Sequence, residues 1–241
     1  MGHTPSGHSV DATLPSKLPG WFNPLLGKLD SLNPADLRPG VLPPPPPEDK
    51  PNKWHTEPAR PSAVLILLRE NGDGPEVLLQ RRASGLRHHA GEIAFPGGMM
   101  DSTDKGAAQC ALREASEELG VEPESVNVIS QLPRLWIPVS NFAVTPVLGW
   151  WHSPHPVRPI GETEVASAIR VPLSTLANPA IRVQVKFPSG HFGPGFQTDK
   201  GLVWGFTGGV LAWLLELGGW AQEWDDTRMV ELPPRTRRQS E

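Results

Sequence analysis

Residues 98–121 read GMMDSTDKGAAQCALREASEELGV, and this stretch decides how the rest of the chain is interpreted. Its apolar residues recur at steps of three and four, which is typical of the buried face of a helix. We therefore expect a helix over residues 104–119, with Ser102 or Thr103 as its N-cap. Gly120 stands where a left-handed residue commonly ends a helix. The apolar stripe consists of Ala108, Ala111, Leu112, Ala115 and Leu119.

The same helix carries three glutamates, Glu114, Glu117 and Glu118, whose spacing places them on one face. Like charges at this spacing repel, and they lie toward the carboxyl end of the helix, where the dipole disfavours anions. Local stability therefore does not explain them, whereas a divalent cation with a preference for oxygen ligands would offset their charge. Arg113, four residues before Glu117, is placed to orient it. A simply solvated acidic face is the alternative that this helix alone leaves open.

A glycine-rich segment precedes the helix and reads LLQRRASGLRHHAGEIAFPGG over residues 78–98. Gly97 and Gly98 permit backbone conformations that bring main-chain groups close to a phosphate or a metal ion. Arg82 and Arg87 add guanidinium groups that suit phosphate oxygens. The segment therefore indicates a phosphate-binding approach to the acidic helix.

Together the two segments resemble the Nudix box. Its pattern is a glycine, five spacers, a glutamate, seven spacers and then R-E-apolar-x-E-E-x-G-apolar. Gly98 and residues 113–121 follow the pattern. Asp104 stands in place of the first glutamate, and eight residues rather than seven separate it from Arg113.

The glycine-rich segment further resembles one Nudix subgroup, the coenzyme A pyrophosphatases. Their signature is roughly L-L-T-x-R-S/A, three spacers, R, three spacers, G, three spacers and F-P-G-G. Gln80 is the one departure, because the signature has threonine there. Residues 138–147 and 164–165 resemble later segments of the subgroup. The residues that fit the signature are Leu78, Leu79, Arg82, Ala83, Arg87, Gly91, Phe95, Pro96, Gly97 and Gly98.

The resemblance implies the Nudix fold, an α/β fold of the α+β type with a mixed β-sheet sandwiched between helices and the box as loop–helix–loop. It implies Mg²⁺- or Mn²⁺-dependent hydrolysis of the pyrophosphate of coenzyme A or acyl-CoA, which gives 3′,5′-adenosine bisphosphate and (acyl-)4′-phosphopantetheine. An ADP-ribose or nucleotide-sugar pyrophosphatase is the alternative. A Nudix domain that senses a nucleotide without cleaving it is disfavoured, because all three box glutamates are present.

The resemblance also implies roles for particular residues. Glu117 is either a third metal ligand or the base that takes a proton from water, and Glu164 is a second candidate base. The expected sets are Glu114, Glu117 and Glu118 for the metal, Glu117, Glu164 and Arg113 for catalysis, and Arg82, Arg87, Gly97 and Gly98 for the substrate.

Composition narrows the class of protein. The chain has 241 residues, a formal net charge of −4 and one cysteine, Cys110. The charge argues against a nucleic-acid partner, and the lone cysteine excludes an internal disulfide framework. Residues 201–220 are apolar enough to suggest a membrane span, but their glycines and Glu216 favour a strand followed by a buried helix. We expect a cytoplasmic protein that binds a small nucleotide; the oligomeric state stays open, a homodimer included.

The pattern along the chain predicts a domain over residues 60–232. Residues 1–59 are proline-rich and expected to be largely irregular, although residues 18–29 carry apolar side chains that suit a short segment anchored on the domain. Residues 233–241 are expected to be a tail. Strands are expected over residues 63–69, 76–81, 126–132, 142–151, 164–172, 181–187 and 202–205, and a second helix over 209–217.

Overall fold

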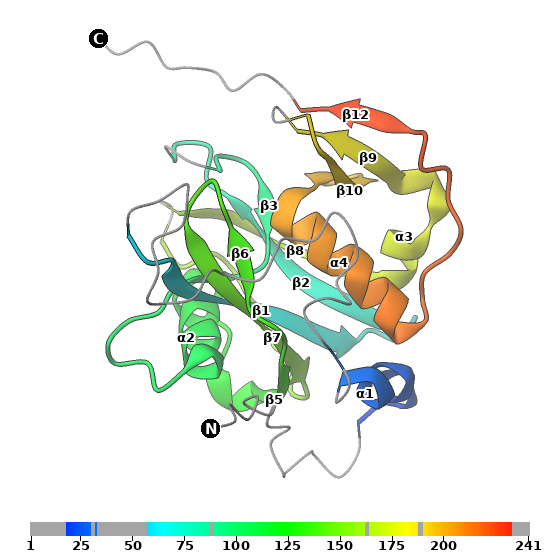
Figure 1. Ribbon diagram of the computed structural model, residues 1–241. Helices are drawn as coiled ribbons and strands as arrows, with labels where there is room; N and C mark the ends of the chain where they lie inside the picture. Colours follow the sequence, from blue (N-terminus) through cyan, green and yellow to red (C-terminus); the bar gives the residue numbers. More distant parts are fainter. Residues whose placement is uncertain are drawn as a thin grey trace, which may run out of the picture.

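The computed structural model describes residues 18–29, 32, 57–86, 89–161, 164–187 and 190–232 (Figure 1). Its largest element is a sheet of eight strands. These are β1 (Arg60–Glu70), β2 (Pro75–Arg82), β3 (Ile93–Ala94), β4 (Gly97–Met99), β5 (Val126–Gln131), β6 (Leu135–Ile137), β7 (Phe142–Trp151) and β8 (Val165–Pro172). The central order is β3-β2-β1-β7-β5, while β4 pairs with β1, β6 with β7 and β8 with β2. The sheet is mixed, because β1 and β7 run parallel and its other pairs are antiparallel.

Strand β1 is buried on both faces because alternate side chains enter two different cores. Leu65 and Leu67 belong to the cluster beneath one helix layer. Ile66 and Leu68 belong to the cluster beneath the other layer. The period of two in a strand thus explains why this run is continuously apolar rather than alternating.

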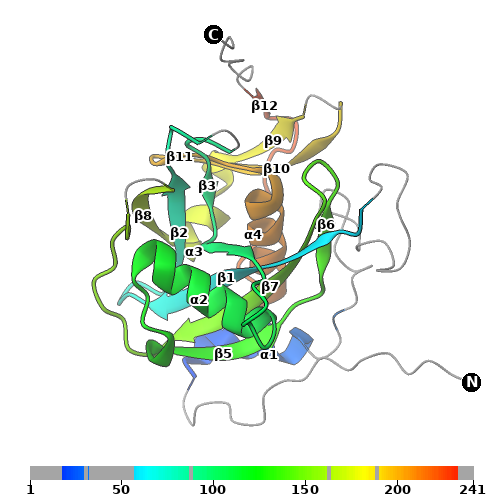
Figure 2. The ribbon, with the colours of Figure 1, turned by 90° about the vertical axis from the view of Figure 1, so that its left-hand side faces the viewer.

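Helices cover both faces of this sheet (Figures 1 and 2). Helix α2 (Ala107–Leu119) packs against β1 and β4 on one face. Helix α4 (Gly205–Gly218) lies on the opposite face, where it also contacts helix α1 (Asn23–Leu29) and helix α3 (Leu173–Ala177). The expected mixed sheet between helices is therefore confirmed.

Helix α4 is apolar all round because a second sheet covers the side that faces away from β1. That sheet has the order β11-β10-β9-β12, from β9 (Arg182–Lys186), β10 (Phe192–Thr198), β11 (Gly201–Val203) and β12 (Met229–Glu231). The apolar stretch 201–220 forms β11 and α4, as predicted. Within the described ranges, no helix is long and apolar enough to cross a membrane.

The short helices include a segment from the region expected to be irregular. A 3₁₀ turn, η1 (Gly20–Phe22), leads into α1, and the side chains of Phe22 and Leu25 are fully buried. Trp21 donates a hydrogen bond from its indole nitrogen to the Glu70 carboxylate at the end of β1. This part of the chain is therefore in the core rather than laid across the surface. Among the described residues, 3₁₀ turns also occur at η3 (Pro123–Ser125) and η4 (Pro179–Ile181).

The start of α2 differs from the expectation, whereas its end agrees. The helix begins at Ala107 rather than at residue 104, and neither Ser102 nor Thr103 caps it. The reason is a turn in which the Asp101 carboxylate accepts hydrogen bonds from the Thr103 N–H and hydroxyl, at 2.9 and 3.0 Å. Gly120 ends the helix in the left-handed region at φ 71°, as predicted.

Candidate active site

Four carboxylates line one pocket of about 110 Å³ beside α2. Three of them come from the helix, and Glu164 comes from the turn before β8. A pocket of this size has room for an ion with a few water molecules, since one water takes up about 30 Å³ in the liquid. The lining residues are Glu114, Glu117, Glu118, Ile160, Glu164 and Val165. The structure thus brings together the acidic residues that the sequence singled out.

Glu118 is the most buried of these carboxylates, with 6% of its surface exposed. Its Oε2 accepts a hydrogen bond of 2.8 Å from the Gly97 N–H. Burial raises the pKa of Glu118 to about 7, against the opposite influence of the Gln80 side chain and the Gly97 N–H. The fold therefore holds a carboxyl group whose charge is poorly compensated near neutral pH.

Glu114 packs directly against the backbone of Gly98. A methyl group added at Gly98 would lie 2.6 Å from the carboxyl carbon of Glu114, which is closer than real contacts allow. An alanine at Gly98 would therefore force the Glu114 carboxylate to move. Burial raises the pKa of Glu114, and although Arg113 opposes this, the charges of Glu117 and Glu164 add to it.

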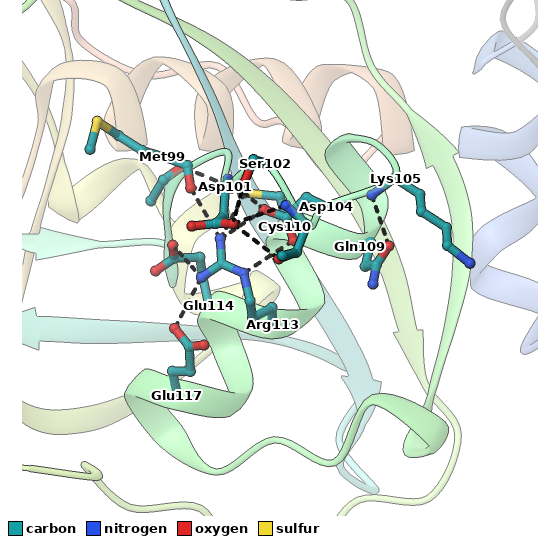
Figure 3. A network of polar contacts seen from close by, with 12 residues as sticks. Met99, Asp101, Ser102, Asp104, Lys105, Gln109, Cys110, Arg113, Glu114 and Glu117 are labelled. Carbon is teal, nitrogen blue, oxygen red and sulfur yellow. Dashed lines mark hydrogen bonds and ion pairs between the residues drawn. The ribbon is translucent and has the colours of Figure 1, made fainter.

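Arg113 joins the acidic residues into one network (Figure 3). Its Nη1 donates to Glu114 at 2.9 Å and to Glu117 at 3.0 Å. Its Nη2 also donates to the Met99 carbonyl at 3.1 Å. The sequence predicted a contact with Glu117 alone; the guanidinium in fact positions two of the glutamates and the end of β4.

Asp104 occupies the position at which the chain departs from the box pattern. Its two oxygens accept from the Nε and Nη2 of Arg113, at 3.1 and 2.9 Å (Figure 3). The carboxylate is only 1% exposed, and the Arg113 hydrogen bond lowers its pKa to about 2. Asp104 therefore anchors the arginine, a role that sequence spacing could not assign because the turn at residues 101–106 sets the distance.

The structure describes three of the four residues expected to bind the substrate phosphates. Gly97 and Gly98 form β4 beside the acidic pocket. Arg82 lies near enough to Glu118 to lower its pKa, and the buried Nε of Arg82 has no hydrogen-bond partner in the described part of the chain. Arg87 lies outside the described residues.

Cys110 lies beneath this network as a buried thiol. Its sulfur is 3.5 Å from the Met99 carbonyl oxygen, and the side chain is fully buried. Burial raises the pKa of Cys110 to about 11, so the group stays protonated at neutral pH. This environment suits a structural thiol rather than a nucleophile.

The donor set fits a divalent cation. In the arrangement observed, Arg113 takes one oxygen each of Glu114 and Glu117, and Gly97 takes one of Glu118. Across the described ranges, no three acidic, histidine or cysteine side chains already stand as a finished ligand set. Each glutamate nevertheless keeps a second oxygen, all three line the same pocket, and Mg²⁺ or Mn²⁺ prefers such ligands. A cation there would offset both the burial of Glu118 and the mutual repulsion.

Comparison with known proteins gives the family. The NUDIX domain description matches residues 58–179. The chain is 40% identical over 167 residues to the uncharacterized Nudix hydrolase NudL of Citrobacter koseri, with 66% of this chain and 83% of the relative covered. It is 39% identical over 173 residues to NudL of an Enterobacter species, with the same coverage of 66% and 83%. Among solved structures, the Nudix hydrolase RenU of M. smegmatis is 27% identical, with a TM-score of 0.42, over 49% of this chain and 74% of that one.

The chain belongs to the Nudix hydrolase family. It is accordingly an enzyme that hydrolyses a pyrophosphate linkage in a small nucleotide-derived substrate. Nudix hydrolases generally use divalent metal ions, commonly Mg²⁺ or Mn²⁺. The acidic helix identified from the sequence is the Nudix helix of this family.

Proposed function

We propose that this enzyme hydrolyses the pyrophosphate of coenzyme A or acyl-CoA, with Mg²⁺ or Mn²⁺ held by Glu114, Glu117 and Glu118. The pocket that these carboxylates share with Glu164 is the observation that carries the metal site. The choice of coenzyme A is supported by the upstream signature, which the chain follows from Leu78 to Gly98 except at Gln80.

The residues divide the chemistry among themselves. A bound divalent ion neutralises charge on the pyrophosphate oxygens and lowers the pKa of water. Arg82 and Arg87 bind phosphate oxygens as negative charge redistributes in the transition state, and the Gly97–Gly98 backbone leaves room for that approach. Arg113 holds the helix carboxylates in place, anchored in turn by Asp104.

The proton of the attacking water goes to a carboxylate, Glu164 or Glu117. The water oxygen forms a bond to one phosphorus, and the bond from that phosphorus to the bridging oxygen breaks. Each product therefore keeps one of the two phosphates of the pyrophosphate. The products are 3′,5′-adenosine bisphosphate, which also retains its 3′-phosphate, and (acyl-)4′-phosphopantetheine. Substitution of Glu164 and of Glu117 by Gln, one at a time, distinguishes the two candidate bases, because loss of the base lowers kcat with little effect on KM.

A larger hollow adjoins the acidic pocket and supports a substrate that extends beyond the pyrophosphate. It measures about 500 Å³ and is lined by residues 119–120, 156 and 158–161. Ile160 lines both spaces, which therefore lie next to each other. Volumes of this order are usual for small-molecule sites, which range over about 300–1,000 Å³.

A substrate panel tests the proposal. Purified protein is incubated with coenzyme A, ADP-ribose or a nucleotide sugar, in Mn²⁺, in Mg²⁺ or in EDTA, and the products are identified by mass. We expect the highest kcat/KM for coenzyme A or an acyl-CoA. A higher value for ADP-ribose or a nucleotide sugar would select the alternative pyrophosphatase. Binding without turnover in Mn²⁺ would instead indicate a sensing domain. The cytoplasmic location and a homodimer remain predictions outside this test.

A further inference from the structure

Gln80 is a buried polar residue that the assigned roles leave unused. It lies in strand β2, and its side chain is 0% exposed. Neither the amide nitrogen nor the amide oxygen has a hydrogen-bond partner among the residues that the structure describes. An unpaired buried polar group costs about 1–3 kcal/mol, so such an arrangement persists where another state of the protein uses the group.

Gln80 lies on the face of the sheet that α2 covers. Its neighbours across the sheet are Ala94 of β3 and Ala168 of β8, both with small side chains. Leu78, two residues earlier and therefore on the same face of β2, belongs to the core cluster beneath α2. The Gln80 side chain reaches the vicinity of the Glu118 carboxylate on that helix.

The charge of Glu118 is only partly compensated by its neighbours. The Gly97 N–H is the one donor that completes a hydrogen bond to it within the described ranges, and that bond engages Oε2. An ionised carboxylate accepts several hydrogen bonds, and Gln80 carries two N–H donors that have no other described use. The Gln80 amide thus has donors without an acceptor, and the Glu118 carboxylate can accept further hydrogen bonds.

We infer that Gln80 is a positioning residue for Glu118, whose carboxylate its amide holds by a donated hydrogen bond when a divalent ion is bound. The inference rests on the proposed metal site. It also gives a reason for the departure from the subgroup signature, because glutamine spans a longer distance from strand to helix than the threonine it replaces. Partners that orient a metal ligand commonly change metal affinity or activity by about 10–100-fold when removed.

Direct Mn²⁺ binding to the full chain, followed by calorimetry, tests this inference without relying on turnover. Gln80→Met keeps the volume of the side chain and removes its amide. We expect it to weaken Mn²⁺ binding about tenfold and to lower kcat with little change in the KM for coenzyme A. The metal-free variant should be as stable as the wild type or more so, because an unpaired buried amide has gone.

Two comparisons separate positioning from packing. In the Glu118→Gln background, Gln80→Met should change Mn²⁺ affinity less than twofold, because the group it acts through is already lost. Gln131→Met, the same change at an exposed strand position, should leave affinity unchanged. Gln80→Leu is the second variant if Gln80→Met fails to fold; it also removes the donors, and it should also weaken binding.

Three results would overturn the inference. Wild-type Mn²⁺ affinity in Gln80→Met shows that the amide does not act on the site. A loss of equal size in the Glu118→Gln background shows that it acts on another group, and a raised KM alone shows that it contacts substrate. A wild-type protein that binds no Mn²⁺ would refute the metal site itself, which distinguishes failure of the proposed function from failure of this step.

Discussion

Replacing Glu118 with glutamine should stabilise the metal-free protein while it destroys the enzyme. Burial raises the pKa of Glu118 from its ordinary value of 4.5 to about 7 in the folded state. The folded state therefore binds the proton more tightly than the unfolded state. Its stability consequently falls as the pH rises from 4.5 to about 7 and stays low above that. A rise in the pKa from 4.5 to about 7 corresponds to about 3 kcal/mol, an upper value because the surroundings relax around a charge.

Urea unfolding in EDTA at two pH values measures this effect. At pH 8 the wild type must carry a buried charge that glutamine lacks, so Glu118→Gln should be more stable by about 1–3 kcal/mol. At pH 5 Glu118 is mostly protonated in the folded state but mostly ionised in the unfolded state, so the difference should fall below about 1 kcal/mol. Glu122→Gln, an exposed change just beyond the helix, should alter the free energy of unfolding by no more than about 0.5 kcal/mol at either pH.

Added Mn²⁺ should reverse the order of the two proteins. Ligand binding stabilises the folded state by an amount that grows with the ratio of free metal to its Kd, so the wild type should gain more than the variant. Equal or lower stability of Glu118→Gln at pH 8 in EDTA, or a difference that does not depend on pH, would refute the reasoning about this carboxyl group.

Three further changes probe the surroundings of the site and the core. Gly98→Ala places a methyl group 2.6 Å from the carboxyl carbon of Glu114, so it should lower kcat/KM by about tenfold or more in steady-state kinetics. Gly85→Ala adds a methyl group with nothing within 4 Å and should leave kcat/KM unchanged. Asp104→Asn breaks the paired contact with Arg113 and should cost about 1–3 kcal/mol at pH 7 in urea unfolding. Because the pKa of Asp104 is lowered from 3.8 to about 2, that difference should persist above pH 3.8 and shrink as the pH falls toward 2. Phe22→Ala should cost about 3–5 kcal/mol if the N-terminal helix belongs to the core, and an unchanged midpoint would show that it does not.

The sequence predicts the five longer strands of the main sheet and the Nudix helix because their signals are local, but it does not predict the short strands β3, β4 and β6. Residues 63–69 form a continuous apolar run of strand length, and residues 104–119 repeat at the helical period. The expected strands all appear, with ends that differ by a few residues. The helix start is wrong because Asp101 organises a preceding turn through contacts that periodicity does not report.

In the second sheet, the sequence predicts β9 and β11 but neither β10 nor β12. Strand β10 reads FGPGFQT, whose proline and glycines favour a loop when the sequence is read alone. In the fold, a methyl group at Gly195 would lie 2.6 Å from a Val185 methyl, so the glycine is dictated by packing between strands. Helix α1 is similarly hidden, because seven residues within a proline-rich region are too few to show a period. Tertiary contacts decide both elements.

In the site, too, local spacing predicts some residues, and only the folded chain reveals others. Spacing alone places Glu114, Glu117 and Glu118 on one face, and the structure brings them to one pocket. The sequence spacing could not show that Asp104 anchors Arg113 or that Gln80 lies beside Glu118. Both contacts join residues whose distance is set by the folded chain. The departures from the family pattern at these two positions were the only signal available.

Release of 3′,5′-adenosine bisphosphate from coenzyme A, measured over a Mn²⁺ titration for the wild type and Glu118→Gln, tests most directly whether the acidic pocket holds a catalytic ion. The wild-type rate should rise to saturation with Mn²⁺ and vanish in EDTA, and the variant should be slower by about 100-fold or more. An undiminished rate in EDTA, or a variant as fast as the wild type, would contradict the metal site on which the mechanism depends.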